Sequence, residues 1–327
     1  MNLCLVTGGS GFLGTRLVRA LLEQGKAVRV FDLTRSSELD PAVEFVAGDV
    51  RRREQLLQAA RGAEIVFHLV GLMPQSRAPD DLMQAVNVEG TRNALEAAVP
   101  AQARRFVFLS SMEVYGYPER SPFSEDHPLR PIGVYGRNKV EAEALCIQYW
   151  KQHGLETVSL RPSTLVGPGI AEPTFVMLLK QLRNPPRILP LPAGGRSRFQ
   201  MTAVSDCVEA CWLAAERPGV AGEAFNLGAE GTLSMREQVE ALFDRLGKPR
   251  PALISVPAGP AKQVLRLLYR LGLSKLEPDH FNLMDTDMVM DGGKAKRLLG
   301  FTPKQSNLDM ILESYDFVMQ EKERRDG

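Results

Sequence analysis

Short apolar runs alternate with amphipathic segments along the first half of the chain. The runs that have the length of buried strands are 3–6, 27–31, 43–47, 65–70, 105–109 and 156–160. Between them, residues 12–23, 81–99 and 134–150 show the periodicity of amphipathic helices. This alternation predicts an α/β fold, a doubly wound parallel sheet of Rossmann type with helices on both faces. Ligands of such sheets bind beyond the carboxyl ends of the strands.

The pattern changes after residue 165, where segments rich in proline and glycine interrupt the periodicity. We therefore expect a dinucleotide-binding domain at residues 1–165 and a smaller C-terminal α/β substrate-binding domain at 166–327. Residues 199–228 again contain strand-like and helical runs, and we expect them to return to the first domain.

Two helices are predicted in the second domain. Ser234 with Glu237 three residues later is a capping box that starts one of them. Residues 264–273 predict a short amphipathic, basic helix. Contact of this helix with a membrane is one interpretation, and packing over the substrate is the one we favour.

Glycines 8, 11 and 14 lie between the first strand and the first helix. The first permits a tight turn, the second lets a pyrophosphate approach the main chain, and the third lets the helix pack against the strand. Asp32 ends the second apolar run, where a carboxylate binds the ribose hydroxyls of NAD and repels the 2′-phosphate of NADP. Arg35 lies near enough to keep NADP open as the alternative.

Other polar or small residues also follow strands. Asp49 can bind the adenine amino group or cap a helix that begins near Arg51, and the two roles are compatible. Gly71 and Ser111 follow the fourth and fifth strands. Because these positions share one edge of the predicted sheet, they support a ligand site there.

Tyr135 and Lys139 lie four residues apart, on one face of a predicted helix. A tyrosine has an ordinary pKa near 10, which is high for base catalysis at neutral pH. We expect the Lys139 ammonium to lower that pKa and Ser111 to orient the oxygen of the substrate. The pattern favours proton removal from a carbinol as its hydride passes to a nicotinamide, or the reverse reaction.

Bulk properties exclude several other classes of function. The formal net charge is +1, which gives no general attraction to nucleic acid or to an anionic membrane. Neither the four cysteines nor the four histidines have the spacing of a metal site, so we expect no metal and reduced thiols. We expect no signal peptide and no membrane span, and we predict a cytoplasmic protein with a small-molecule substrate.

Several motifs together resemble the extended short-chain dehydrogenases/reductases of the NAD-dependent epimerase/dehydratase family. They lie at residues 7–14, 48–50, 87–91, 110–116, 135–139, 161–162, 225–228 and 299–304. The resemblance implies the catalytic triad Ser111, Tyr135 and Lys139, an NAD cofactor, and a homodimer formed through helices at about 81–99 and 135–150. It also implies cofactor contacts at Gly8, Gly11, Phe12, Leu13, Asp32, Asp49, Val50, Val70, Asn87, Ser110, Tyr135, Lys139 and Pro162.

The chain departs from that family's patterns at two places. Met112 replaces the acid that the dehydratases carry before Glu113, so dehydration by that route is not expected. Thr164 stands where many nucleotide-sugar epimerases carry an asparagine that grips the sugar diphosphate. Arg198 lies near their diphosphate-binding arginine, with a plain surface arginine as the alternative. We assign Ser111, Thr164 and Arg198 as candidate substrate contacts.

Three functions follow, in order of preference. The first is an NAD-dependent nucleotide-sugar epimerase that acts through a keto intermediate, with Tyr135 as acid and base. The second is an NAD(P)-dependent oxidoreductase of a hydrophobic alcohol or ketone with the same triad, similar to hydroxysteroid dehydrogenases or carbonyl reductases. The third is a non-catalytic NAD sensor or scaffold, which would have no need of the triad.

Overall fold

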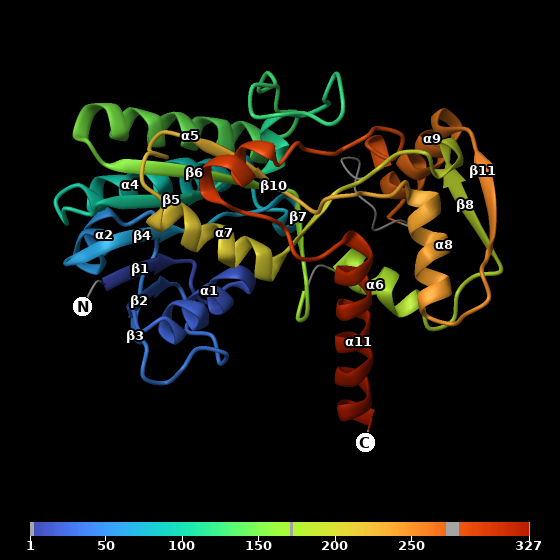
Figure 1. The fold of residues 1–327 in the computed structure, drawn as a ribbon, viewed down its shortest axis with the longest axis horizontal. Helices are drawn as coiled ribbons and strands as arrows, with labels where there is room; N and C mark the ends of the chain where they lie inside the picture. The colour runs from blue at the N-terminus through green and yellow to red at the C-terminus, as the bar shows by residue number, and fades with distance from the viewer. Residues whose placement is uncertain (1–2, 171–172, 273–280, 327) are drawn as a thin grey trace.

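Seven parallel strands form the central sheet of the computed structural model, which describes residues 3–170, 173–272 and 281–326 (Figure 1). Their spatial order is β10-β6-β5-β4-β1-β2-β3. The strands are β1 (Leu3–Thr7), β2 (Ala27–Asp32), β3 (Glu44–Ala47), β4 (Ala63–His68), β5 (Arg105–Leu109), β6 (Glu156–Pro162) and β10 (Ala224–Leu227).

Helices cover both faces of this sheet. On one face, α1 (Phe12–Glu23) and α7 (Val204–Glu216) pack side by side over a core that includes Leu17, Val30 and Cys211. On the other face lie α2 (Arg53–Ala59), α4 (Gly90–Ala98) and α5 (Val134–His153), which bury residues such as Leu56 and Leu95. The predicted doubly wound α/β fold is therefore confirmed.

The helix predicted at residues 81–99 consists of three pieces. They are α3 (Asp80–Gln84), a π turn η2 (Ala85–Glu89) and α4. The π turn carries Asn87, whose side-chain amide exchanges two hydrogen bonds with the backbone of Leu72, at 2.7 and 2.9 Å. This local rewinding holds the loop that follows β4, and π turns are frequent at functional sites.

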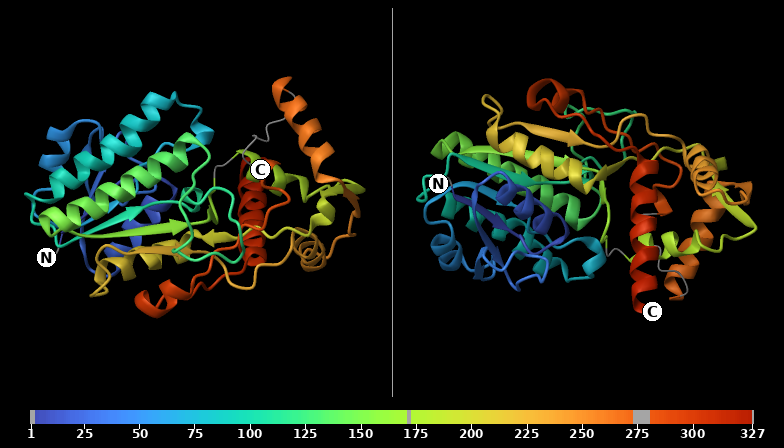
Figure 2. Two further views of the ribbon diagram at one scale, coloured as in Figure 1. Left: turned by 90° about the horizontal axis from the view of Figure 1, so that it is seen from above. Right: turned by 60° about the horizontal axis from the view of Figure 1, so that its bottom comes forward.

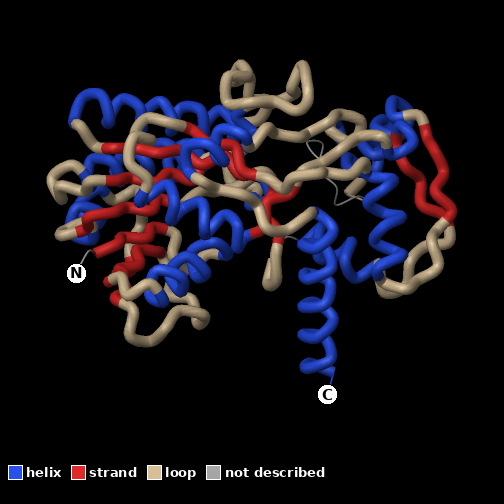
Figure 3. The backbone as a smooth tube through the Cα atoms, in the orientation of Figure 1, coloured by secondary structure: helices blue, strands red, loops and turns tan. Residues whose placement is uncertain are grey.

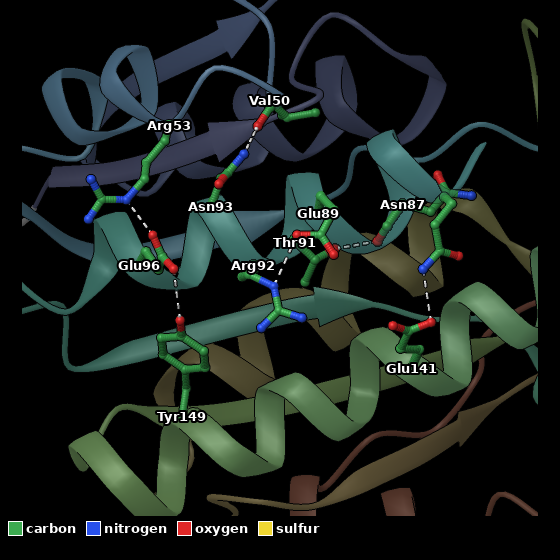
Figure 4. Close-up of polar contacts among 11 residues, drawn as sticks. Val50, Arg53, Asn87, Glu89, Thr91, Arg92, Asn93, Glu96, Glu141 and Tyr149 are labelled. Carbon is green, nitrogen blue, oxygen red and sulfur yellow. Dashed lines mark hydrogen bonds and ion pairs between the residues drawn. The ribbon is translucent and has the colours of Figure 1, made fainter. Parts of the chain in front are cut away.

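Polar contacts join α4 to its neighbours (Figure 4). The Glu96 carboxylate pairs with Arg53 and accepts a hydrogen bond from Tyr149 of α5 at 3.5 Å. The Asn93 amide donates to the carbonyl of Val50 at 2.9 Å, which ties α4 to the segment after β3.

The smaller lobe lies beyond the carboxyl ends of the strands (Figures 1 and 3). Two short parallel sheets belong to this part of the chain, β11 with β8 and β7 with β9. Its elements are β7 (Thr164–Val166), α6 (Pro173–Gln181), β8 (Ile188–Pro192), β9 (Met201–Ala203), α8 (Met235–Arg245), β11 (Ala252–Val256), α9 (Ala258–Arg270) and α11 (Asn307–Asp326). Short 3-10 or π turns occur at η1 (Pro74–Ser76), η3 (Met112–Val114), η4 (Ala193–Gly195) and η5 (Ala295–Leu299).

Two of the lobe's helices were expected from the sequence. Ser234 and Glu237 form the predicted capping box at the start of α8. The basic helix α9 begins at Ala258, six residues before the predicted start, and the predicted end at Leu273 lies outside the described residues. Pro257 sets this earlier start as the extended N-cap residue, and the apolar stripe read from the sequence begins only inside the helix.

The chain returns to the large sheet after residue 199. Strand β10 pairs in parallel with β6, and Val204, Ala210 and Cys211 of α7 belong to the core below it. Phe301 is buried in the same core, so part of the chain near residue 300 also packs on the first domain. Two segments that follow residue 165, the one from α7 to β10 and the one near Phe301, therefore pack on the first domain.

Candidate active site

The glycine loop after β1 leaves no room for side chains. Gly8 has a φ of +76°, a conformation that favours glycine. A Cβ on Gly14 would lie 2.1 Å from the carbonyl oxygen of Gly8, so α1 can sit this close to the loop only with glycine there. The first N–H groups of α1, from Phe12 onward, have no partners within the helix and carry its partial positive charge. This loop fits a dinucleotide pyrophosphate.

The Asp32 carboxylate lies beside this loop at the end of β2. It accepts hydrogen bonds from the backbone N–H groups of Ser10 at 3.0 Å and Leu33 at 2.8 Å. The Arg35 guanidinium donates to the carbonyls of Asp40 at 2.7 Å and Val43 at 3.2 Å, so its hydrogen bonds hold its own loop. A fixed carboxylate favours free ribose hydroxyls, which agrees with NAD as the cofactor.

Asp49 does not cap a helix. Its carboxylate accepts from the Arg51 backbone N–H at 2.9 Å and pairs with the Arg51 guanidinium, and α2 begins at Arg53 with Arg52 as its N-cap. The Arg51 hydrogen bond holds the pKa of Asp49 below its ordinary value. Val50 is buried, with its side chain directly against Gly90 of α4. The predicted cap at Asp49 is therefore wrong, because this carboxylate closes a turn two residues ahead of the helix.

The loop after β4 passes close to the glycine loop. The Val70 backbone nitrogen lies 3.0 Å from the place of a Cβ on Gly8. At Gly71 a Cβ would lie 3.3 Å from the Lys139 amine and 3.6 Å from the Asn87 side-chain oxygen. The structure therefore brings Val70 and Asn87 from the predicted cofactor contacts to Lys139 of the predicted triad.

Ser111, Tyr135 and Lys139 meet at the carboxyl end of β5. The Tyr135 hydroxyl and the Ser111 side chain are hydrogen-bonded. The Lys139 amine lies 5.6 Å from the centre of the Tyr135 ring and donates to the carbonyl of Leu109 at 2.6 Å. Ser111 also accepts from the Glu113 backbone N–H at 3.2 Å, which fixes its rotamer. Tyr135 thus lies near both other members of the predicted triad, Ser111 and Lys139.

Burial sets the pKa values in this cluster. It raises the pKa of Tyr135 above the ordinary value, with a further increase from the Glu113 charge, whereas the Ser111 hydrogen bond opposes the shift. It lowers the pKa of Lys139 to about 8, against the charges of Glu143, Cys146 and Glu113. The pKa of Tyr135 is thus shifted opposite to the lowering expected from Lys139, and desolvation of the phenolate is the largest cause.

The Ser110 side chain shows a second feature that fits a bound ligand. Its side chain is buried, and its hydroxyl finds no hydrogen-bond partner among the described residues. A buried hydroxyl without a partner is costly in a folded protein. Its place between Leu109 and Ser111 fits the predicted cofactor contact.

A buried hydrogen-bond network, which the sequence analysis did not predict, includes residues of α5 and β6. Arg161 donates two hydrogen bonds to the Glu143 carboxylate, at 2.9 and 2.6 Å, and one to the Tyr115 hydroxyl at 2.7 Å. Tyr115 in turn donates to the Asn226 side chain at 2.6 Å. Glu143 follows Lys139 by one helical turn, and this i+4 spacing after the Tyr–Lys pair is a signal that could have found it.

His68, which has no predicted role, lies at the end of β4 opposite Thr7. Its ring nitrogens contact the Thr7 hydroxyl at 2.7 Å and the Thr91 hydroxyl at 3.1 Å. Burial, with the Lys139 charge as the smaller cause, lowers the pKa of His68 to about 3, so its ring is neutral at physiological pH.

Of the predicted substrate contacts, Ser111 belongs to the triad, whereas Thr164 and Arg198 come from later parts of the chain. Thr164 is exposed at the start of β7. Arg198 donates to the Asp287 carboxylate from its backbone N–H and two guanidinium nitrogens, at 2.8, 2.9 and 2.6 Å. Met112, beside Ser111, is buried in a cluster with Phe123 and other apolar side chains. No described residues form a cluster of three or more His, Cys, Asp or Glu that could hold a metal.

The remaining predicted cofactor residues lie in α1 and at the end of β6. Leu13 is a buried residue of α1, Phe12 is partly buried at the start of that helix, and Pro162 ends β6 opposite Leu227. Among the helices that the structure describes, none is both long enough and apolar enough to cross a bilayer.

Comparison with known proteins gives a consistent result. Residues 4–228 match the model of the NAD dependent epimerase/dehydratase family. Over 343 residues the chain is 31% identical to a 3 beta-hydroxysteroid dehydrogenase/Delta 5-->4-isomerase of Mycobacterium tuberculosis, covering 96% of this chain and 90% of that protein.

Two solved structures have the same fold over nearly their whole length. A short-chain dehydrogenase/reductase superfamily protein of Agrobacterium tumefaciens with bound NAD superposes with a TM-score of 0.78 at 30% identity, covering 99% of each chain. The dTDP-glucose 4,6-dehydratase of Streptomyces venezuelae, with NAD and TYD bound, has a TM-score of 0.76 at 27% identity and 98% coverage of each chain.

Proposed function

The chain belongs to the NAD-dependent epimerase/dehydratase family, and from that premise we propose that it interconverts a secondary alcohol and a ketone of an apolar substrate. Bound NAD supplies the two-electron oxidant for the alcohol. The glycine loop, Asp32 and the loop at Val70 would hold it, with Lys139 and Ser110 at the reacting end.

Tyr135 moves the proton in this proposal. As the carbinol is oxidised, its hydroxyl proton passes to the Tyr135 phenolate, and in the reverse reaction the Tyr135 hydroxyl donates that proton to the carbonyl oxygen and becomes the phenolate. Ser111, already hydrogen-bonded to Tyr135, orients the reacting oxygen. Lys139, with a pKa of about 8, carries positive charge at neutral pH and stabilises the developing phenolate.

The ion pair between Arg198 and Asp287 is the observation that carries the choice of substrate. A diphosphate is bound best by an unpaired guanidinium, but Arg198 already donates two guanidinium N–H groups and its backbone N–H to the Asp287 carboxylate. A phosphate brought to Arg198 would be repelled by Asp287 at this site, which is about one-third exposed. Met112 beside Ser111 is buried and apolar, so it offers a diphosphate no polar group. Both features favour a substrate without a diphosphate.

The nucleotide-sugar epimerase stays as the second candidate. The same triad can oxidise a sugar hydroxyl and reduce the resulting ketone on its other face. The likeness to the dTDP-glucose 4,6-dehydratase over 98% of the chain supports it. The exposed Thr164 hydroxyl could still meet a phosphate oxygen.

Purified protein incubated with NAD and one substrate at a time separates the two candidates. A 3β-hydroxysteroid and a plain secondary alcohol represent the apolar class, and UDP-glucose and dTDP-glucose represent the other. We expect NADH to accumulate in step with ketone from the apolar class, with a KM that Arg198→Gln changes less than about threefold. Epimerised sugar nucleotide without net NADH, abolished by Arg198→Gln, would overturn the proposal.

A further inference from the structure

Helix α9 exposes large apolar side chains to solvent. Val264, Leu267 and Leu271 are 57%, 58% and 61% exposed. Spaced by three and four residues, they form one stripe along the helix and its C-cap. None of the thirteen residues of α9 is fully buried, whereas α8 of the same lobe buries Leu242 and Phe243. The outer face of α9 is therefore amphipathic and has no partner within the described part of the chain.

The charged side chains of α9 itself, Lys262, Arg266 and Arg270, are all basic. Residues 245–276 contain seven lysines and arginines and no aspartate or glutamate, although the whole chain has 40 basic and 39 acidic residues. Lys262 pairs with Asp285. Arg266 approaches only the Asn282 amide oxygen, at 3.4 Å, and neither Arg266 nor Arg270 forms an ion pair within the described residues. These two exposed arginines lie one turn apart, beside the apolar stripe.

The helix stands at the end of the small lobe, away from the large sheet (Figure 2, left). Helices α4 and α5, through which the family resemblance implies a dimer, lie at the other end of the molecule (Figure 1). A contact made by α9 would therefore leave both the predicted dimer helices and the strand ends free.

We propose that α9 docks on the surface of an anionic membrane. Val264, Leu267 and Leu271 enter the boundary between headgroups and acyl chains, and Arg266 and Arg270 contact lipid phosphates. A short helix with one apolar stripe and arginines beside it has the composition of an interfacial helix. Helix α9 carries no acidic residue that would repel anionic lipids, and Asp285 beside it is paired with Lys262. The proposal does not depend on the substrate, although an apolar substrate would reside in that membrane.

Sedimentation of the full chain with vesicles tests this docking without any turnover. The vesicles are phosphatidylcholine alone or phosphatidylcholine mixed with phosphatidylglycerol. We expect binding to the mixed vesicles that weakens with added salt. Leu267→Ser/Leu271→Ser should lower the partition coefficient about tenfold or more, and Arg266→Gln/Arg270→Gln about fivefold for each arginine. Leu298→Ser, at a 46% exposed leucine outside this lobe, serves as the matched control.

NAD titration shows whether each variant is folded, because the dinucleotide site lies in the other lobe. Unchanged NAD affinity together with lost vesicle binding would support the proposal. Equal binding of the wild type and the Leu267→Ser/Leu271→Ser variant would overturn it, as would no binding of the wild type. A vesicle-free dimer that this variant dissociates would also overturn it, since the surface would then belong to a second copy.

Discussion

Single backbone groups position the side chains that carry the chemistry. The Leu109 carbonyl holds the Lys139 amine, and the Glu113 N–H holds the Ser111 hydroxyl. Burial then sets their proton affinity, and it acts against the charged form in both Tyr135 and Lys139. The phenolate that the reaction needs is therefore costly until positive charge or a hydrogen bond compensates for its desolvation.

His68 gives a pH-dependent stability that can be measured. Its pKa in the folded chain is about 3, below the ordinary 6.5, so between these pH values the unfolded chain binds one more proton at this residue. Stability from the neutral ring is present above pH 6.5 and is lost as pH falls toward 3. We expect His68→Asn to reduce the slope of unfolding free energy against pH by about 1.4 kcal/mol per pH unit in this window.

Urea unfolding at a series of pH values makes that measurement. The control is His153→Asn, at an exposed histidine that ends α5, which removes a histidine without touching the core. If His68→Asn leaves the slope of unfolding free energy against pH unchanged, another buried group causes the loss of stability at acidic pH.

Spacing made some of these residues predictable and others not. Gly8, Asp32, Tyr135 and Lys139 stand at fixed offsets within one strand–turn–helix unit or one helix face, so the sequence alone places them. Arg161 and Glu143 come from a strand and a helix that meet only when the sheet is assembled. The spacing of Glu143 after Lys139 points to the carboxylate, but nothing in either local pattern identifies Arg161 as its partner.

At the scale of elements, the packing of α1 on its loop depends on Gly14. We expect Gly14→Ala to weaken NAD binding about tenfold or more and to lower the unfolding free energy by about 1–3 kcal/mol, because the new Cβ overlaps the backbone of Gly8 and Gly9. Calorimetric titration with NAD measures the change in affinity, and urea unfolding measures the change in unfolding free energy.

Gly259→Ala provides the matched control for that substitution. It lies in the first turn of α9, where a Cβ would meet nothing within 4 Å. We expect unchanged NAD affinity and a gain in stability of at most about 1 kcal/mol from helix propensity. Equal effects of the two alanines on NAD binding would contradict the packing argument for Gly14.

Local signals also decided which elements could be predicted. The capping box of α8 is a complete signal within four residues, and the structure reproduces it. The π turn at Ala85–Glu89 was missed because the hydrophobic period continues through it, and only Asn87 reaching Leu72 reveals the rewinding. The small lobe's β8 and β11 pair across more than sixty residues. Neither segment contains a local sequence signal that predicts pairing with a strand so far along the chain.

For the whole molecule, the expected homodimer would use α4 and α5. Exposed residues on α5 form a stripe at Arg137, Glu141, Ala144 and Gln148. Two copies of this helix can approach closely at the alanine. We expect Ala144→Arg to convert a dimer into a monomer, read as a halved mass by light scattering. Ala252→Arg, at an exposed alanine of β11, should leave the mass unchanged, and a dimer that survives Ala144→Arg would place the interface elsewhere.

Two lobes with separate tasks complete the molecule. The predicted cofactor residues and triad belong to the large sheet and its covering helices, and the small lobe carries the Arg198–Asp287 pair and the exposed apolar face of α9. Catalysis in this account rests on one phenol, since Ser111 and Lys139 act through it.

The most direct test compares Tyr135→Phe with the wild type in NAD titration and in NADH formation from the best substrate of the panel. The account predicts NAD dissociation constants within about threefold of each other and a rate reduced at least about a hundredfold in the variant, because this substitution keeps the aromatic ring and removes the hydroxyl that carries the proton. A variant that forms NADH at the wild-type rate would contradict the account.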